Sequence, residues 1–139
     1  MSYLLDTKVL SELCKDPRCN ANVAAWFAPV PEHAVYLSVL VIGEIRRGIE
    51  RIRRRDLQAA ATLETWLTQV VAQHRERILA VNREVAEEWG RMTATRSLPT
   101  IDSLLAATAK IHGLMLVTRN VTDIAATGVP YHNPFESTL

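Results

Sequence analysis

Residues 3–13 read YLLDTKVLSEL, and this stretch decides how the chain is expected to fold. Residues 3–5 form a short apolar run of the kind that makes a buried strand. Asp6 follows this run directly, and the apolar residues after it (Val9, Leu10 and Leu13) recur at helical spacing. The stretch therefore predicts a strand that passes through an acidic residue into a helix, which is how an α/β fold begins.

The same alternation of strand and helix continues along the chain. Apolar runs predict further strands at 34–37, 78–81, 114–117 and 129–132. Between them lie helical patterns, for which the expected N-terminal caps are Asn20 or Asn22, Ser38, Asp56, Asn82 and Thr100. Gly113 stands where a helix ends. We therefore predict a single α/β domain over residues 1–139, with a mostly parallel sheet of about five strands between helices.

The composition is that of a globular protein. The chain has 139 residues, of which 48% are hydrophobic and 22% charged, and its net charge is +1. No apolar run approaches the roughly 20 residues of a membrane-spanning helix, and the start MSYLLDTKVL lacks the features of a signal peptide. We expect a cytoplasmic protein without membrane association. Two cysteines, Cys14 and Cys19, make neither a disulfide framework nor a structural zinc site.

Several polar residues are expected at one edge of the sheet. Those that follow strands closely are Asp6, Thr118, Arg119, Asn120 and Asp123. Glu44 lies about two turns into the helix after the second strand, and Asp102 lies in the first turn of a later helix. In parallel sheets, ligands bind beyond the carboxyl ends of the strands. If these acids meet, a hard cation such as Mg²⁺ or Mn²⁺ would relieve their repulsion and could promote attack of water on a phosphodiester.

Each acid also has a purely structural interpretation. Asp6 could cap the helix that follows it, and Asp102 could complement the dipole of its own helix. Glu44 could be a solvated helix residue, although its neighbours are apolar and an unpaired acid is costly to bury. Asp123 could be a turn residue. The choice depends on whether these side chains meet in space.

Arginines are concentrated in residues 46–55, at positions Arg46, Arg47, Arg51, Arg53, Arg54 and Arg55. Arg51 and Arg55 continue the helix face of Glu44, so we consider them candidates to bind the phosphates of a nucleic acid beside the acids. The alternative is a solvated face held by ion pairs, for example between Glu50 and Arg54.

Four segments resemble, in order, the motifs of PIN-domain nucleases. The first is YLLDTKVLSE at residues 3–12. The second is YLS at 36–38 with GEIRRG at 43–48, and the third is TID at 100–102 with LAATA at 105–109. The segment LVTRNVTD at 116–123, with NPF at 133–135, resembles the end of the VapC and FitB toxins of that family.

The resemblance implies an α/β/α sandwich that hydrolyses RNA with Mg²⁺ or Mn²⁺, as the toxin of a type II toxin–antitoxin pair. The residues it assigns to catalysis are Asp6, Glu44, Asp102, Asn120 and Asp123, with the metal held by Asp6, Glu44 and Asp102. Asn120 replaces a fourth aspartate of some members; it can offer a carbonyl oxygen but no charge, so one firmly bound ion is expected. Thr7, Ser38 and Thr118 are expected to orient the carboxylates by hydrogen bonds.

The resemblance also implies partners. These are an RNA substrate, a small VapB- or FitA-like antitoxin and a second copy of the chain, with larger assemblies that include antitoxin and DNA. Two other functions stay open from the residues alone. One is a PIN-like domain that binds nucleic acid without cutting it. The other is an aspartyl-phosphate phosphatase, which usually has a second aspartate two residues after the first, where this chain has Lys8.

Overall fold

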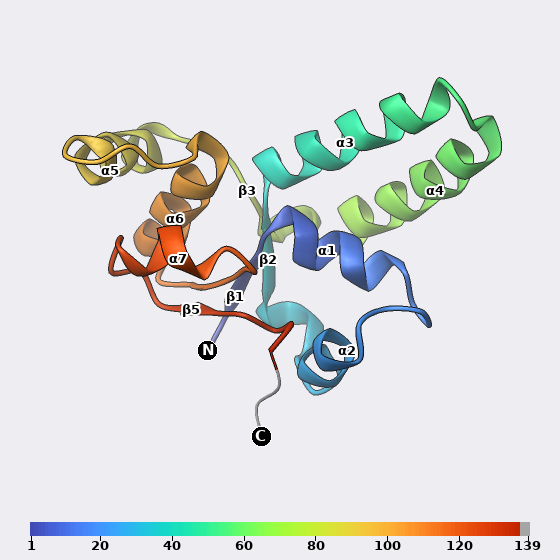
Figure 1. Cartoon of the computed structure of the whole chain (residues 1–139), viewed down its shortest axis with the longest axis horizontal. Helices are drawn as coiled ribbons and strands as arrows, with labels where there is room; N and C mark the ends of the chain where they lie inside the picture. Colours follow the sequence, from blue (N-terminus) through green and yellow to red (C-terminus); the bar gives the residue numbers. More distant parts are fainter. Residues whose placement is uncertain (137–139) are drawn as a thin grey trace.

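A five-stranded parallel sheet forms the centre of the molecule (Figure 1). The computed structural model describes residues 1–136. The strands are β1 (Tyr3–Leu5), β2 (Val35–Ser38), β3 (Ile78–Leu79), β4 (Met115–Val117) and β5 (Tyr131–His132). Their order in the sheet is β3-β2-β1-β4-β5, and every neighbouring pair is parallel. The predicted α/β class and strand number are confirmed, and the sheet is parallel throughout.

Helices cover both faces of this sheet. They are α1 (Thr7–Cys14), α2 (Ala21–Phe27), α3 (Val39–Arg53), α4 (Leu57–Gln73), α5 (Arg83–Thr93), α6 (Thr100–His112) and α7 (Val121–Ala125). In Figure 1, α1 to α4 lie on one side of the strands and α5 to α7 on the other, which gives three layers. Within residues 1–136, no helix combines the length and the apolar character needed to cross a membrane.

Most of the predicted helix caps are present. The side chains of Asn20, Ser38, Asp56 and Asn82 each accept a hydrogen bond from a backbone N–H in the first turn that follows them. Gly113 ends α6 in the left-handed region, at φ 66°, which a glycine adopts without steric cost. The prediction for Thr100 is wrong, because α6 begins at Thr100 itself and its N-cap is Pro99, which has no side-chain acceptor.

The strands are shorter than the apolar runs that predicted them. The third covers 78–79 rather than 78–81, and the fifth covers 131–132 rather than 129–132. The short helix α7 was not predicted, and Asp123 lies in its first turn rather than in a loop.

The core sits on the middle strands, where Leu4, Leu37 and Leu116 are at most 1% exposed. The strand ends are therefore firmly placed by apolar packing.

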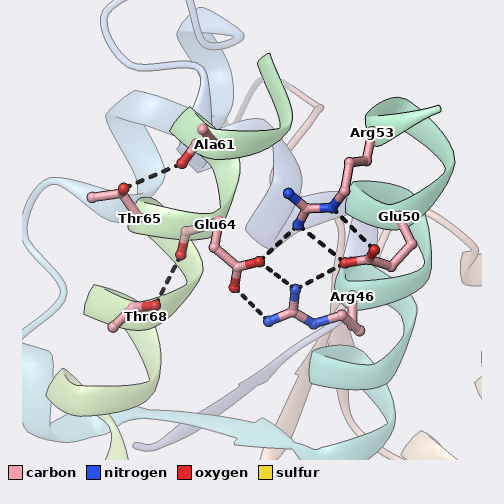
Figure 2. A network of polar contacts seen from close by, with 7 residues as sticks. All are labelled: Arg46, Glu50, Arg53, Ala61, Glu64, Thr65 and Thr68. Atoms are coloured by element: carbon pink, nitrogen blue, oxygen red, sulfur yellow. Dashed lines mark hydrogen bonds and ion pairs between the residues drawn. The ribbon is translucent and has the colours of Figure 1, made fainter. Parts of the chain in front are cut away.

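A network of charged side chains joins α3 to α4 (Figure 2). Both terminal nitrogens of Arg46 donate to the carboxylate of Glu64 on α4, at 2.7 and 2.6 Å. Arg53 donates to the same carboxylate at 2.9 Å, and Glu50 accepts from both arginines. The predicted pair of Glu50 with Arg54 is therefore wrong, because the partners of Glu50 are Arg46 and Arg53.

The Glu64→Gln variant should lower the melting temperature of the chain near neutral pH. The hydrogen bonds from Arg46, with smaller effects from Arg53, lower the pKa of Glu64 from 4.5 to about 2. A lowered pKa means that the folded state holds the ionised form, so this stabilisation is present above pH 4.5 and is lost as the pH falls toward 2.

The measurement is a series of thermal melts of both proteins between pH 7 and pH 3. The difference in melting temperature should shrink below pH 4.5 and also shrink in high salt. Glu76→Gln changes an exposed glutamate outside the network and serves as the control. A difference that is equal at all pH values would show that the ionised network does not stabilise the helix pair.

Candidate functional site

A cleft of about 760 Å³ opens at the carboxyl ends of the central strands. Asp6, Glu44, Asp102 and Asn120 all line it, and they come from the end of β1, from α3, from α6 and from the residues after β4. In the sheet, β1 lies between β2 and β4, so the segments that leave these three strands flank one another. Residues up to 114 positions apart in sequence therefore face one cleft.

Asp6 is the most buried acid of the cleft, with 6% exposure. Its two carboxylate oxygens accept hydrogen bonds from the backbone N–H of Val9, at 2.9 Å, and from the hydroxyl of Thr118, at 2.5 Å. Burial raises the pKa of Asp6, and the charge of Asp102 adds to this effect, while the two hydrogen bonds oppose it. Asp6 is thus the N-cap of α1, and it is also a carboxylate whose ionised form is disfavoured by burial and by the charge of Asp102.

Glu44 is oriented by the residue that follows Asp6. The hydroxyl of Thr7 donates a short hydrogen bond to Oε1 of Glu44, and Arg47, one turn along α3, lies 3.6 Å from Oε2. Thr7 and Thr118 therefore each donate to one acid, as proposed for them from the resemblance. The expectation for Ser38 is wrong, because its hydroxyl accepts from the backbone N–H of Leu40 and only caps α3.

Asn120 lies between two acids. Its amide nitrogen donates to Oδ2 of Asp102 at 2.7 Å and to Oδ2 of Asp123 at 2.9 Å. The backbone N–H of Asn120 donates to Thr118 at 3.0 Å, which fixes the segment after β4. Asn120 therefore acts as a donor toward the acids and not through its carbonyl oxygen. Asp123 belongs to this group through Asn120 and does not itself line the cleft.

The acids share the cleft without forming a preassembled metal cage. Among the described residues, no three His, Cys, Asp or Glu side chains lie close enough to hold one ion together. Asp6, Glu44 and Asp102 each have their own hydrogen-bond donor instead. Carboxylate oxygens are nevertheless the ligands that Mg²⁺ and Mn²⁺ prefer, and Mg²⁺ usually keeps several waters, so few direct protein ligands are required. The donor set suits such an ion in kind.

Four cations line the same cleft, and of these the sequence analysis assigned only Arg51 to RNA binding. Arg51 lies there as predicted, together with Lys8, Arg47 and Arg119. Arg55 does not, because α3 ends at Arg53 and the helix face that would have carried it stops there. Arg47 could have been found from its position three residues after Glu44, since residues at that spacing are neighbours on a helix. The cleft is thus lined by both acidic and basic side chains.

Comparison with known proteins identifies the class. The model of the PIN domain matches residues 3–127. Toxin FitB of Neisseria gonorrhoeae is 30% identical, with 95% of this chain and 97% of that protein covered. VapC ribonuclease Y4jK of Sinorhizobium fredii is 29% identical, with 96% and 97% covered. A solved structure of FitAB bound to an IR36 DNA fragment contains a chain that is 28% identical, with TM-score 0.88 and coverage of 99% and 98%.

The chain belongs to the PIN-domain family. Within that family it is similar, over almost its whole length, to toxins of the FitB and VapC type. The likeness to the FitAB structure confirms the predicted α/β/α sandwich. The matched residues include Asp6, Glu44, Asp102 and Asn120, which the fold brings to the cleft.

Proposed function

We propose that the chain, as a single domain over residues 1–139, is a divalent-metal-dependent endoribonuclease and the toxin of a toxin–antitoxin pair. The observation that carries this proposal is the cleft itself, in which Asp6, Glu44 and Asp102 lie among four cationic side chains. Carboxylates suit a divalent ion, and arginine and lysine suit the phosphates of RNA. The similarity to a VapC ribonuclease supports RNA as the substrate.

In this mechanism Asp6, Asp102 and Glu44 would hold the ion. Mg²⁺ or Mn²⁺ bound there would supply Lewis-acid stabilisation of the charge that develops on the phosphodiester. The protein contributes orientation: Thr118 and the N–H of Val9 fix Asp6, Thr7 fixes Glu44, and Asn120 fixes Asp102. Addition of water across the P–O3′ bond leaves a 5′-phosphate and a 3′-hydroxyl.

Neutral Asn120 favours a single firmly bound ion. Its amide hydrogens already satisfy one oxygen of Asp102 and one of Asp123, so these two acids do not need a cation between them. The role of Asp123 is then to orient the side chain of Asn120 by accepting its hydrogen bond.

The partner we propose is a small VapB- or FitA-like antitoxin, with a homodimer as the basic unit and larger complexes that include DNA. Two likenesses support this proposal: FitB is named a toxin, and a related chain was solved as FitAB on a DNA fragment. Co-expression of the reading frame next to this gene should restore growth to cells in which the chain is toxic.

The test of the enzymatic proposal is incubation of the purified chain with RNA in chelator and in millimolar Mg²⁺ or Mn²⁺. Cleavage should require the metal, and sequencing of the RNA ends should find 5′-phosphates. RNA binding without cleavage in either metal would favour the non-catalytic alternative. Hydrolysis of a small phosphate ester without cleavage of RNA would favour a phosphatase.

Arg51→Ala should weaken RNA binding and flatten its dependence on salt, whereas Arg55→Ala should not. Arg51 lines the cleft and Arg55 lies outside it. Each phosphate contact that is lost reduces the slope of log affinity against log salt by about 0.7–0.9. The two variants are a matched pair, because each removes one arginine from the same segment. Equal slopes of log affinity against log salt for the two variants would show that Arg51 on α3 does not contact RNA phosphates in the cleft.

A further inference from the structure

Arg119 is one of the four cations of the cleft, and the proposed function gives it no individual role. Its neighbours in sequence both contact the acids: Thr118 donates to Asp6, and Asn120 donates to Asp102. The backbone at Arg119 is therefore held on both sides, and its exposed side chain lines the same cleft as the acids. A phosphate bound near Asp6 and Asp102 would lie within reach of this guanidinium.

The guanidinium of Arg119 rests on an aromatic ring. Its central carbon lies 4.7 Å from the centroid of Phe135, in the range of a cation–π contact. Phe135 follows β5 and is fixed by two hydrogen bonds: its N–H donates to Oδ1 of Asn133 at 3.0 Å, and its carbonyl accepts from Asn22 of α2 at 2.8 Å. The ring also packs against the core. Phe135 is thus held in place by its own contacts, and its ring contacts the guanidinium of Arg119.

Arg119 is also available to a ligand. Within residues 1–136 no carboxylate forms an ion pair with it, and its charge is only the smallest of the causes that lower the pKa of Glu12. Arg47 on the opposite wall, in contrast, lies 3.6 Å from Glu44. The walls are opposite because α3 follows β2 and Arg119 follows β4, and these strands flank β1 in the sheet. A strand of nucleic acid that crosses Asp6 would meet Arg47 and Arg51 on one side and Arg119 on the other.

We propose that Arg119 binds a backbone phosphate of the substrate beside the acids, and that Phe135 is the positioning residue that holds the guanidinium toward the cleft. This inference rests on the proposed function, because it takes RNA as the substrate. The chemistry that Arg119 recognises is the phosphate and not the base, so its contribution is independent of RNA sequence and depends on salt. Phe135 acts through Arg119 and does not touch the substrate.

The experiment measures RNA affinity as a function of salt, with a labelled single-stranded oligoribonucleotide and proteins that all carry Asp102→Asn to prevent cleavage. Arg119→Ala should weaken binding about tenfold, the loss expected for one charged hydrogen-bonded contact, and should reduce the salt slope by about 0.7. Arg83→Ala removes an exposed arginine of α5 that does not line the cleft, and it should change neither quantity.

Phe135 is tested by a double-mutant cycle. Phe135→Leu removes the aromatic face but keeps an apolar side chain, and it should weaken RNA binding about threefold, whereas Phe135→Tyr keeps the face and should bind like the parent protein. Adding Phe135→Leu to Arg119→Ala should cause no further loss, because the arginine that the ring positions is already absent. If Phe135→Leu lowers the melting temperature into the assay range, Phe135→Met replaces it.

The outcomes separate this inference from the proposed function. Affinity and salt slope that do not change in Arg119→Ala would overturn the role of Arg119. Losses in Arg119→Ala and Phe135→Leu that multiply in the double variant would overturn the positioning role of Phe135. Absence of RNA binding by the protein with an intact Arg119, or absence of metal-dependent cleavage by the wild type, would instead overturn the proposed function.

Discussion

Asp6→Asn, Glu44→Gln and Asp102→Asn should each reduce RNA cleavage by more than about 100-fold, since loss of even an indirect partner of a metal ligand costs about 10–100-fold. The three side chains line one cleft and supply the hard oxygen ligands and the negative charge that a divalent ion requires. Each amide keeps the shape of the acid and one acceptor oxygen, which can still accept from Val9 at position 6, from Thr7 at position 44 and from Asn120 at position 102. At position 6 the second oxygen is replaced by an NH₂ group, which can donate to the hydroxyl of Thr118 instead of accepting from it. What each variant loses is the negative charge of one carboxylate.

The measurement is the initial rate of cleavage of a labelled RNA in saturating Mg²⁺ or Mn²⁺, with circular dichroism and thermal melts to show that each variant is folded. Asp56→Asn is the matched control, because Asp56 also caps a helix, lies outside the cleft, and is replaced by an equally good cap. Its rate should equal that of the wild type. Near-normal cleavage by Asp102→Asn would remove Asp102 from the proposed metal site.

Asp6→Asn should raise the melting temperature of the metal-free chain and abolish most of the stabilisation by metal. The pKa of Asp6 is raised, first by burial and then by the charge of Asp102, so the folded state binds the proton more tightly than the unfolded chain does. Stability is therefore lost as the pH rises from the ordinary value of 3.8 through the folded pKa, and the amide escapes this loss. Asparagine still caps α1.

Metal should reverse the order of the two proteins. At a concentration 100 times its dissociation constant, an ion that binds only the folded state stabilises it by about 2.7 kcal/mol, which corresponds to roughly 10 °C for a domain of this size. The wild type should gain this shift, and Asp6→Asn should gain much less because one ligand is neutral. Asp102→Asn is a weaker test, because Asp102 also lies in the first turn of α6, where its charge stabilises the helix.

Thermal melts of wild type and Asp6→Asn in chelator and in millimolar Mg²⁺ or Mn²⁺, from pH 4 to pH 8, test both parts. The excess melting temperature of the variant in chelator should grow as the pH rises above 3.8. Equal shifts of both proteins on addition of metal would show that Asp6 is not a ligand. A variant that melts below the wild type in chelator at every pH would contradict the electrostatic account of Asp6.

The parts of the site that could be predicted from sequence are those that local pattern determines. Asp6 directly follows a strand, and the parallel sheet inferred from the alternation of strands and helices brings strand ends together at one edge. Glu44 and Asp102 could be located on helices by their spacing from Ser38 and from the helix that ends at Gly113. The motif resemblance then joined these positions into one site.

What could not be predicted depends on side chains from distant segments. Arg55 has the right spacing from Glu44, but α3 ends two residues before it, so periodicity alone placed it wrongly. The donor role of Asn120 depends on Asp102 and Asp123 converging on its amide nitrogen. Helix α7 has only five residues, too few for a helical apolar pattern to show. The contact of Arg119 with Phe135 joins two segments of the chain, and no sequence pattern predicts that they meet.

The pairing of β1 with β4 has a consequence for protein synthesis. Leu5, beside Asp6, pairs with Val117, so β1 cannot complete its pairing until β4 has been synthesised. A polypeptide still attached to the ribosome with residues beyond 114 inside the exit tunnel carries Asp6 and Glu44 but lacks Thr118 and Asn120, which fix the acids. The cleft can therefore close only after residues 118–120 have left the exit tunnel. Under the proposed function, truncated products that stop before β4 should not cleave RNA.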